Sequence, residues 1–357
     1  MEKGKVSIYT IAREAGVSPA TVSRVLNGTV RVSEEKKKRI QELIENHGYQ
    51  PNALARSLMN MKSRLLGLLV SDIRNPFYSM LTVECEAAAY RRGYLLMVCN
   101  SVGDNGRDLD YLNKFYKQRV DAVIQIGGTV DEAEPSPEFL AGAGRIAEAI
   151  PFVTTGALDG VDCFRINIDE EESMRLLMEY LHEEGHEKIA LIGGRRDVKS
   201  TAEKQRVYRD MLSAYGIPAR EEYLLENGSY DVEGGERTMR EFLEKGIEMP
   251  TAVIAINDFT AVGVTHALRE KQIRIPEEIS VVSFDNTFIT ETCVPQLTSV
   301  GYDYHAMGEM IIETAVRAIH DPDVHAPAVP ERKPPRVQMI RPELTLRNSS
   351  GRNGYAD

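Results

Sequence analysis

The sequence has no tryptophan, only four cysteines and no long apolar run. No stretch reaches the roughly 18 apolar residues that a membrane-spanning helix needs. The cysteines (Cys85, Cys99, Cys163 and Cys293) are scattered and form no C-x-x-C pair, which argues against a disulfide framework and a zinc site. The first residues lead into no apolar segment typical of a signal peptide, so we expect a cytoplasmic protein without membrane contact.

The motifs of common enzyme classes are also missing. The chain contains no Walker A loop, no GxGxxG fingerprint and no GxSxG elbow. The segment His182–His186 matches the H-E-x-x-H pattern of zinc proteases, but Gly185 lies where a helix should end. The two histidines would then not share one helical face, as zinc binding requires. We therefore expect no enzyme, no metal and no cofactor.

Charge is distributed unevenly along the chain. The formal net charge is −11, yet residues 1–64 hold 12 Lys and Arg against 6 Asp and Glu. The start of the chain is thus basic and the remainder strongly acidic. This distribution is typical of a DNA-binding module joined to a sensor that DNA repels.

Two short helices near the start form the pattern of a helix-turn-helix. Apolar residues recur at helical spacing over residues 8–15, and Gly16 follows as a C-terminal stop. Ser18 is a good N-cap for a second helix over residues 19–26. A third helix is expected over about residues 33–47. In a helix-turn-helix the second helix enters the major groove of DNA.

We expect the outer face of this second helix to contact DNA. Arg24 suits guanine O6 and N7, and Ala20 suits a thymine methyl group. Thr21 and Ser23 can reach phosphates. The alternative, an ordinary helical hairpin within a larger core, is disfavoured because the match is long and the third helix follows. The expected contacts here are Ser18, Pro19, Ala20, Thr21, Ser23, Arg24 and Asn27.

From Leu65 onward, strand and helix patterns alternate. Buried parallel strands read as near-continuous apolar runs, as residues 65–70 do. The alternation runs to residue 154, restarts at residue 164 and continues to residue 284, which predicts two successive doubly wound α/β units. Residues 297–300, 304–320 and 337–340 are left over.

The motifs at Val17–Gly28 and Tyr49–Leu58 are close to signatures of a known family. The chain resembles the lactose/galactose repressor family of bacterial transcription regulators over nearly its whole length, to about Arg347. The resemblance implies an all-α helix-turn-helix head plus hinge helix. These would be joined to an α/β periplasmic-binding-protein-like sensor of two doubly wound lobes.

In this family a short hinge helix corresponds to residues 52–60. The resemblance implies that Leu58 from each of two subunits wedges into the minor groove and kinks the duplex. Asn52, Ala55 and Arg56 would contact the DNA beside it. The alternative is that Leu54 and Leu58 pack on the sensor.

The resemblance also divides the chain into domains. We expect a DNA-binding domain over residues 1–50, a hinge and linker over 51–63, a two-lobed domain over 64–347 and a disordered tail over 348–357. The N-lobe would comprise about 64–160 and 298–321, and the C-lobe about 162–287 and 336–347. The crossings between lobes are expected near 157–165, 287–298 and 321–336.

A ligand in such a fold lies between the lobes, at the carboxyl ends of strands. The polar and aromatic residues found there suit a hydroxylated small molecule, and Tyr78 lies among them. Asp258 could instead cap its helix, and Asp72 could be a strand-end turn residue. After Arg206 the chain departs from the family's Gly-aromatic continuation. The expected effector-binding residues are Asp72, Asn75, Phe77, Arg206, Tyr230, Asn257, Asp258 and Asp285.

The function expected from these features is sequence-specific regulation of transcription, more often repression than activation. A homodimer would bind a double-stranded, pseudo-palindromic operator, controlled by a small polar effector such as a sugar. Two alternatives are a transport-type binding protein, disfavoured by the basic start, and an enzyme, disfavoured by the missing catalytic motifs.

Overall fold

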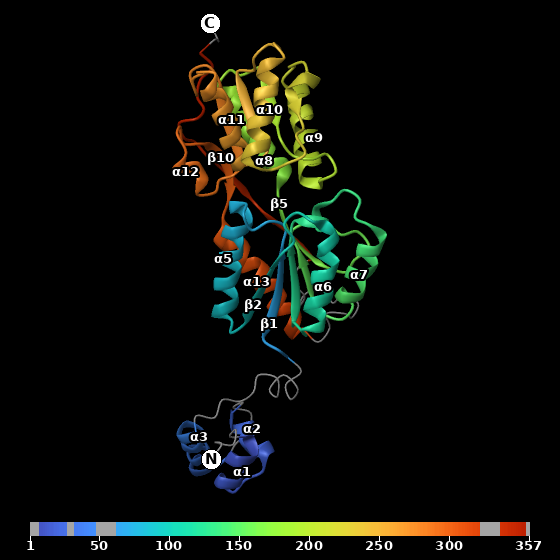
Figure 1. Cartoon of the computed structure of the whole chain (residues 1–357), viewed down its shortest axis with the longest axis vertical. Coiled ribbons are helices and arrows are strands. Elements are labelled where there is room, and N and C mark those ends of the chain that lie inside the picture. The colour runs from blue at the N-terminus through green and yellow to red at the C-terminus, as the bar shows by residue number, and fades with distance from the viewer. Residues whose placement is uncertain (1–6, 27–31, 48–61, 322–335, 355–357) are drawn as a thin grey trace. The chain divides into compact units, whose positions relative to one another are not determined.

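The computed structural model describes residues 7–26, 32–47, 62–321 and 336–354 (Figure 1). The chain divides into two compact units, Met1–Ser63 and Arg64–Asp357. Within the described ranges, no helix is long and apolar enough to cross a membrane.

Three helices make up the described part of the N-terminal unit: α1 (Ile8–Ala15), α2 (Pro19–Leu26) and α3 (Glu34–His47). Each contributes to one small core, whose fully buried members are Ile11, Ala12, Val22 and Ile40. The turn between α1 and α2 passes through Gly16 in the left-handed region, with φ of 65°. This geometry confirms the predicted helix-turn-helix and its third helix.

The larger unit consists of two lobes, each built on a six-stranded sheet. We call residues 64–168, 303–321 and 336–340 the N-lobe, and residues 169–302 and 341–354 the C-lobe. The strand order is β11-β5-β4-β3-β1-β2 in the N-lobe and β12-β10-β9-β8-β6-β7 in the C-lobe. Among the strands that the structure describes, all pairs are parallel except β10 with β12. This arrangement confirms the predicted fold class.

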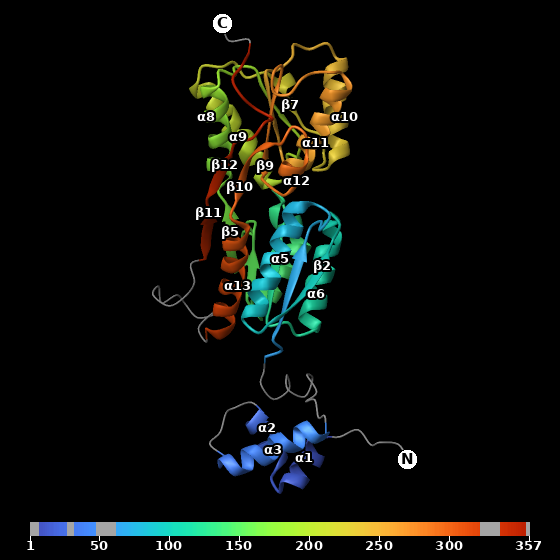
Figure 2. The ribbon, with the colours of Figure 1, turned by 90° about the vertical axis from the view of Figure 1, so that its left-hand side faces the viewer.

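Helices cover both faces of the N-lobe sheet. α5 and α13 lie side by side on one face (Figure 2), and α6 and α7 pack on the other. The strands are β1 (Leu65–Val70), β2 (Leu95–Asn100), β3 (Ala122–Ile126), β4 (Phe152–Thr154), β5 (Phe164–Ile168) and β11 (Val337–Ile340). The helices are α5 (Pro76–Arg91), η1 (Asn105–Arg107), α6 (Asp108–Lys117), η2 (Gly128–Asp131), α7 (Pro137–Ala147) and α13 (Tyr304–His320).

The C-lobe repeats this layering. α8 and α9 pack on one face of its sheet, and α10 and α11 on the other. Its strands are β6 (Ile189–Ile192), β7 (Leu224–Leu225), β8 (Ala252–Ala255), β9 (Ser280–Asp285), β10 (Thr298–Tyr302) and β12 (Pro342–Thr345). Its helices are α8 (Glu170–Glu183), α9 (Lys199–Ala214), η3 (Glu221–Tyr223), α10 (Val232–Glu244), α11 (Asp258–Glu270) and α12 (Ile289–Thr292).

The predicted lobe boundaries are wrong by one strand at each crossing. β5 and β11, expected in the C-lobe, pair with each other in the N-lobe sheet, and β10, expected in the N-lobe, pairs with β9 in the C-lobe. The chain therefore crosses after residues 168, 302 and 340. β5, β10 and β11 each pair within the sheet of the lobe that the chain is about to leave, which satisfies their backbone hydrogen bonds. The chain crosses to the other lobe only after the strand has ended. An apolar pattern predicts that a strand is buried but not which sheet it joins.

The predicted disordered tail is also partly wrong. Ser349 and Ser350 are buried, and Val281 N donates to Ser349 O at 2.7 Å. Tyr180 forms a side-chain hydrogen bond with Ser350 at 3.0 Å. Small polar residues suggested disorder, but here their hydroxyl groups satisfy polar groups of the C-lobe. Residues 355–357 lie outside the described residues.

Candidate functional site

The second helix of the N-terminal unit presents a polar face to solvent. Ala20 and Arg24 are exposed, whereas Pro19 and Thr21 are half-buried. The Ser18 hydroxyl accepts a hydrogen bond from Thr21 N at 3.2 Å and so caps α2. On the opposite face of the helix, Val22 is fully buried, which is worth about 1.5–3 kcal/mol for a side chain of this kind. Burial of that side fixes which residues of α2 face outward.

The predicted hinge contacts Asn52, Ala55, Arg56 and Leu58 lie outside the described residues, as does Asn27 after α2. Ser23 lies within α2. The roles of these residues in DNA contact stay predictions.

A basic stretch on α3 adds positive charge to the same unit. Lys36, Lys37 and Lys38 are exposed, and Arg39 donates to Glu14 O at 3.3 Å. Lysines on an exposed helix face suit phosphate contacts, which position a protein on DNA without reading sequence. These residues were not among the predicted contacts, although the uninterrupted basic run is a signal that identifies them.

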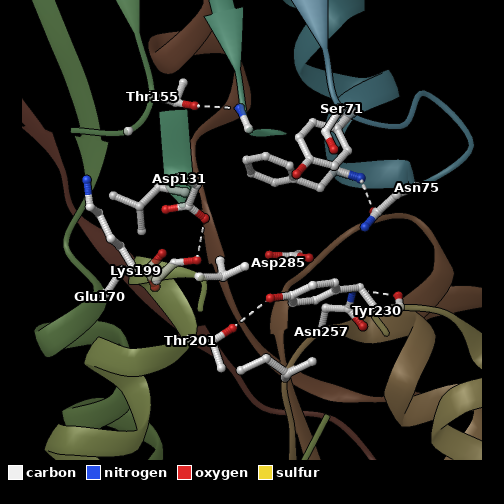
Figure 3. Close-up of a pocket in the computed structure, with 18 of the residues that line it drawn as sticks. Ser71, Asn75, Asp131, Thr155, Glu170, Lys199, Thr201, Tyr230, Asn257 and Asp285 are labelled. Carbon is white, nitrogen blue, oxygen red and sulfur yellow. Dashed lines mark hydrogen bonds between the residues drawn. The ribbon is translucent and has the colours of Figure 1, made fainter. Parts of the chain in front are cut away.

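A cavity of about 950 Å³ lies between the two lobes (Figure 3). Its walls come from segments that follow the carboxyl ends of strands in both sheets, as expected for this fold class. Six predicted residues line it: Asp72, Asn75, Phe77, Tyr230, Asn257 and Asp285. Tyr78, which was noted beside them, lines it as well.

Several of these side chains also hold the local backbone. Asn75 caps α5 by accepting from Phe77 N at 3.0 Å. Asn257 caps α11, and its amide nitrogen donates to Tyr230 O at 2.9 Å. Asp72 accepts a charge-assisted hydrogen bond from Arg74 at 2.6 Å, which holds the pKa of the Asp72 carboxyl below its usual value. Asp72 therefore both stabilises the turn after β1 and lines the cavity.

The Tyr230 ring is fixed at its hydroxyl end. Its oxygen is 2.9 Å from Thr201 Oγ1 and accepts from Arg195 N at 3.3 Å. Burial raises the pKa of the Tyr230 phenol to about 12. The phenol therefore stays protonated near neutral pH and presents a rigid aromatic wall with one polar end.

Gly127 makes room for a second aromatic wall. Its φ is 69°, and a Cβ built at this position would lie 2.5 Å from the Tyr78 hydroxyl oxygen. Its N–H donates to Thr155 Oγ1 at 3.2 Å (Figure 3). A side chain at Gly127 would thus displace Tyr78 from the cavity.

Arg206 does not line the cavity, so its predicted role is corrected. It is exposed and pairs with Glu203 and Asp210, each at 2.7 Å, and with Glu171 at 3.1 Å. The basic residue of α9 that does line the cavity is Lys204. Two residues along a helix turn the side chain by about 200°, so only one of the pair can face inward.

Lys204 is buried and forms an ion pair with Glu170 at the start of α8. Its ammonium nitrogen also lies 4.9 Å from the centre of the Phe284 ring. Both ionic residues were missed as site residues. Two sequence features point to them: Lys204 lies on the buried face of α9, and Glu170 lies in the acidic first turn of α8. The family pattern pointed to Arg206 instead.

Asp258 is a buried structural residue and does not line the cavity, which corrects its predicted role. Its carboxylate accepts from Ser283 Oγ at 2.6 Å, from Thr287 N at 2.7 Å and from Ser299 Oγ at 3.0 Å. These bonds tie β9, β10 and the following turn to the start of α11. The cap of α11 is Asn257, so the capping alternative for Asp258 is wrong too.

Asp285 ends β9 with an unusual backbone, at φ of 91°. Its carbonyl oxygen accepts from the Tyr304 hydroxyl at 2.8 Å, which joins the C-lobe to the N-lobe helix α13. Burial and the nearby Asp258 carboxylate raise the pKa of Asp285 well above its usual value. A non-glycine residue held at positive φ in a cavity is a feature of functional sites.

Asp131 is a cavity residue that sequence reasoning missed. It follows β3 through η2, and its carboxylate accepts from Ser200 Oγ of the C-lobe at 2.7 Å. Burial raises the pKa of Asp131 to about 6. Its sequence signal is weak because it lies five residues beyond the end of β3, whereas Asn257 and Asp285 lie closer to the ends of their strands.

Further bonds join the lobes beside Asp131. Lys199 Nζ donates to Ala157 O at 2.5 Å, and Ala133 N donates to Asp197 O at 2.8 Å. The first turn of α9 and the segment before it thus fasten the C-lobe to the N-lobe along one side of the cavity.

Comparison with known proteins extends these observations. Residues 7–52 match the family described as bacterial regulatory proteins, lacI family, and residues 178–350 match a periplasmic binding protein-like domain. Catabolite control protein A of Priestia megaterium is 32% identical over 342 residues, which cover 94% of this chain and 98% of that protein. The same-named protein of Staphylococcus xylosus is 30% identical over 91% of this chain and 95% of that protein.

Solved structures share the fold over almost the whole chain. The lac repressor dimer bound to operator and the anti-inducer ONPF has a TM-score of 0.83 at 23% identity, covering 96% of this chain and 98% of that chain. The complex of the transcriptional regulator CelR with cellobiose has a TM-score of 0.67 at 26% identity, covering 96% and 99%. The relatives are regulators rather than enzymes, in agreement with the predicted class. The chain therefore belongs to the lacI family of bacterial regulatory proteins and is a transcription regulator with a periplasmic-binding-protein-like sensor domain.

Proposed function

We propose that this regulator acts as a homodimer that represses transcription from a pseudo-palindromic operator and responds to a small carbohydrate-like effector. The observation that carries the proposal is the combination of two features in one chain. These are a helix-turn-helix with an outward-facing Arg24, and a ligand-sized cavity whose polar groups come from two lobes.

The N-terminal unit supports specific DNA binding. Its exposed α2 face offers one bidentate donor, Arg24, and one methyl contact, Ala20, which are the two kinds of group that read base edges in the major groove. The lysines of α3 supply contacts that carry no sequence information. The acidic remainder of the chain disfavours contact with DNA elsewhere.

The cavity supports an effector that is small and polar. Its volume of about 950 Å³ matches pockets that bury a drug-sized ligand. Carboxylates and amides accept and donate hydrogen bonds to hydroxyl groups, while the rings of Phe77, Tyr78 and Tyr230 cover apolar ligand faces. A relative in complex with cellobiose points to the same class of ligand.

Exposed apolar residues support a dimer. On the N-lobe, Tyr90 is 78% exposed, Leu95 is 70% exposed and Val83 is 64% exposed. They belong to α5 and to β2, an edge strand of its sheet. Apolar groups gathered beside an open sheet edge mark an interaction surface. A second copy of the chain is the partner that a symmetric operator demands.

An effector would act by favouring one relative position of the lobes. It shifts the balance only to the extent that it binds one position more tightly than the other. Groups from both lobes line the cavity, so ligand affinity depends on their separation. In the sequence, the N-lobe directly follows the segment that joins it to the DNA-binding unit. A change in the relative position of the lobes can therefore alter operator binding through this segment.

The experiment is fluorescence anisotropy of a labelled palindromic duplex with a central CG step, compared with a scrambled duplex at near-physiological salt. We expect a preference of roughly a thousandfold or more for the palindrome, reduced or increased when sugars are added. Equal, weak binding of both duplexes with and without sugars would contradict the proposal.

A further inference from the structure

The charges that face the cavity are not balanced. Three carboxylates of the cavity wall, on Asp131, Glu170 and Asp285, belong to half-buried residues that line the cavity (Figure 3). Lys204 is the cation that neutralises one of them, through its ion pair with Glu170. Lys199 directs its ammonium group to the carbonyl oxygen of Ala157 instead.

The arginines of the cavity are already engaged at its rim. Arg74 pairs with Asp72 at 2.6 Å, and Arg195 pairs with Asp197 at 2.5 Å. Within the described part of the chain, neither Asp131 nor Asp285 has an ion-pair partner. Asp131 accepts a hydroxyl hydrogen bond from Ser200, whereas no described residue donates a hydrogen bond to the Asp285 carboxylate.

This imbalance has a physical cost. An ionised carboxylate that is taken out of water without a counter-charge is unfavourable, and its pKa rises as a result. Both carboxylates show this effect, and Lys204 offsets it only in part because it is shared with Glu170. A ligand hydroxyl group would supply a hydrogen bond but no charge, whereas a ligand cation would supply both.

The aromatic lining suits a cation as well. Tyr78, Tyr230 and Tyr302 line the same cavity as the two carboxylates. The rings of Phe77 and Tyr78 pack edge to face, with their centroids 5.1 Å apart. Electron-rich ring faces attract an ammonium group once it has left water.

We propose that the effector is a polyol that carries a protonated amine, such as an amino sugar, with its ammonium group held by Asp285. The inference rests on the effector role proposed above and narrows its ligand class. Anionic sugar derivatives, such as sugar phosphates, are disfavoured by the same arrangement, because Arg74, Arg195 and Lys204 are paired with carboxylates and Lys199 donates to Ala157 O.

The test is isothermal titration of the full-length protein with matched ligands at pH 7. Each set contains the amino sugar, its neutral parent and its N-acetyl form: D-glucosamine, D-galactosamine and D-mannosamine with D-glucose, D-galactose and D-mannose. We expect at least one amino sugar to bind ten or more times tighter than both of its neutral counterparts. The preference should shrink as pH falls from 7 to 5, because protonated carboxyl groups no longer attract the amine.

Two variants assign the preference to the cavity. Asp285→Asn keeps the shape of the side chain but removes the carboxyl group that can ionise against the ammonium group, and should reduce the preference for the amine at least tenfold. Removal of an uncompensated charge should also leave the thermal midpoint of the free protein unchanged or higher, so loss of folding does not explain the result. Asp159→Asn makes the same chemical change at a residue whose side chain is 88% exposed, and should leave the preference intact.

The outcomes separate this inference from the proposed function. Neutral sugars that bind as tightly as the amines would overturn the inference and leave the effector role standing. An amine preference that survives in Asp285→Asn would overturn it as well. If no member of any set binds, both the inference and the carbohydrate effector fail, while operator binding is judged separately by anisotropy.

Discussion

At the scale of single residues, Arg24 is an exposed side chain of α2 that we expect to pair with a guanine. Arg24→Ala should relax base preference at one position in each half-site, at a cost of about 1–3 kcal/mol. Arg24→Lys is the matched control, since it keeps the charge but loses the planar, two-pronged donor. The measurement is competition by duplexes substituted at each position in turn. A loss that is uniform over all sequences would show that Arg24 contacts phosphate alone.

Asp131 leads to a prediction about pH. Its pKa of about 6 in the folded protein lies above the ordinary value of 3.8, so the folded state binds a proton more readily than the unfolded state. The ionised carboxylate therefore lowers stability above pH 6, and this loss is relieved as pH falls from about 7 to 4. Asp131→Asn should be more stable than the natural protein at pH 7, with an advantage that shrinks as pH falls through 6 and has largely disappeared by about pH 4. Urea unfolding at both pH values measures this difference, and a difference independent of pH would contradict the assignment.

The residue scale also shows what a family pattern predicts well and what it does not. Residues at or just after the carboxyl ends of strands, such as Asp285 and Asn257, line the cavity as predicted, because strand ends in a parallel sheet share one edge. Arg206 and Asp258 do not line the cavity. The rotation of α9 turns Arg206 toward solvent, where it pairs with Glu203, and a buried network of hydroxyl groups holds the Asp258 carboxylate. Such contacts come from segments far apart in the chain and have no local signature.

At the scale of elements, the start of α9 and the segment before it contact the N-lobe, and we expect these contacts to influence how the lobes meet. Lys199→Ala removes the hydrogen bond to Ala157, and should weaken effector binding several-fold because the joined position of the lobes becomes less favoured. Lys188→Ala is a suitable control, since Lys188 pairs with Glu248 within the C-lobe. Titration calorimetry compares the two variants. Equal affinities would mean that this segment does not influence closure.

The prediction of elements from the sequence succeeded where periodicity decides them. The helices of the N-terminal unit and the apolar strands follow from spacing alone, as α1 and β1 illustrate. The path of the chain between lobes did not follow, because β5, β10 and β11 fit either sheet by pattern. Pairing partners settle that choice, and a single sequence does not contain them.

At the scale of the whole molecule, dimer formation should depend on the exposed face of α5. Tyr90→Glu places a charge at a side chain that is 78% exposed, and should yield monomers with weakened operator binding. Tyr116→Glu, on α6 at the other face of the sheet, is the matched control, because Tyr116 is 50% exposed. Analytical ultracentrifugation reports the outcome. A dimer that persists in the Tyr90 variant would place the interface elsewhere.

The central claim is that the chain reads a symmetric DNA sequence as a dimer. It is tested most directly by repeated selection of duplexes from a random pool with the full-length protein, followed by sequencing. The account predicts enrichment of a pseudo-palindrome whose half-sites each contain a guanine read by Arg24, around a central pyrimidine–purine step that is easily kinked. Enrichment of a single asymmetric site, or no enrichment at all, would contradict it.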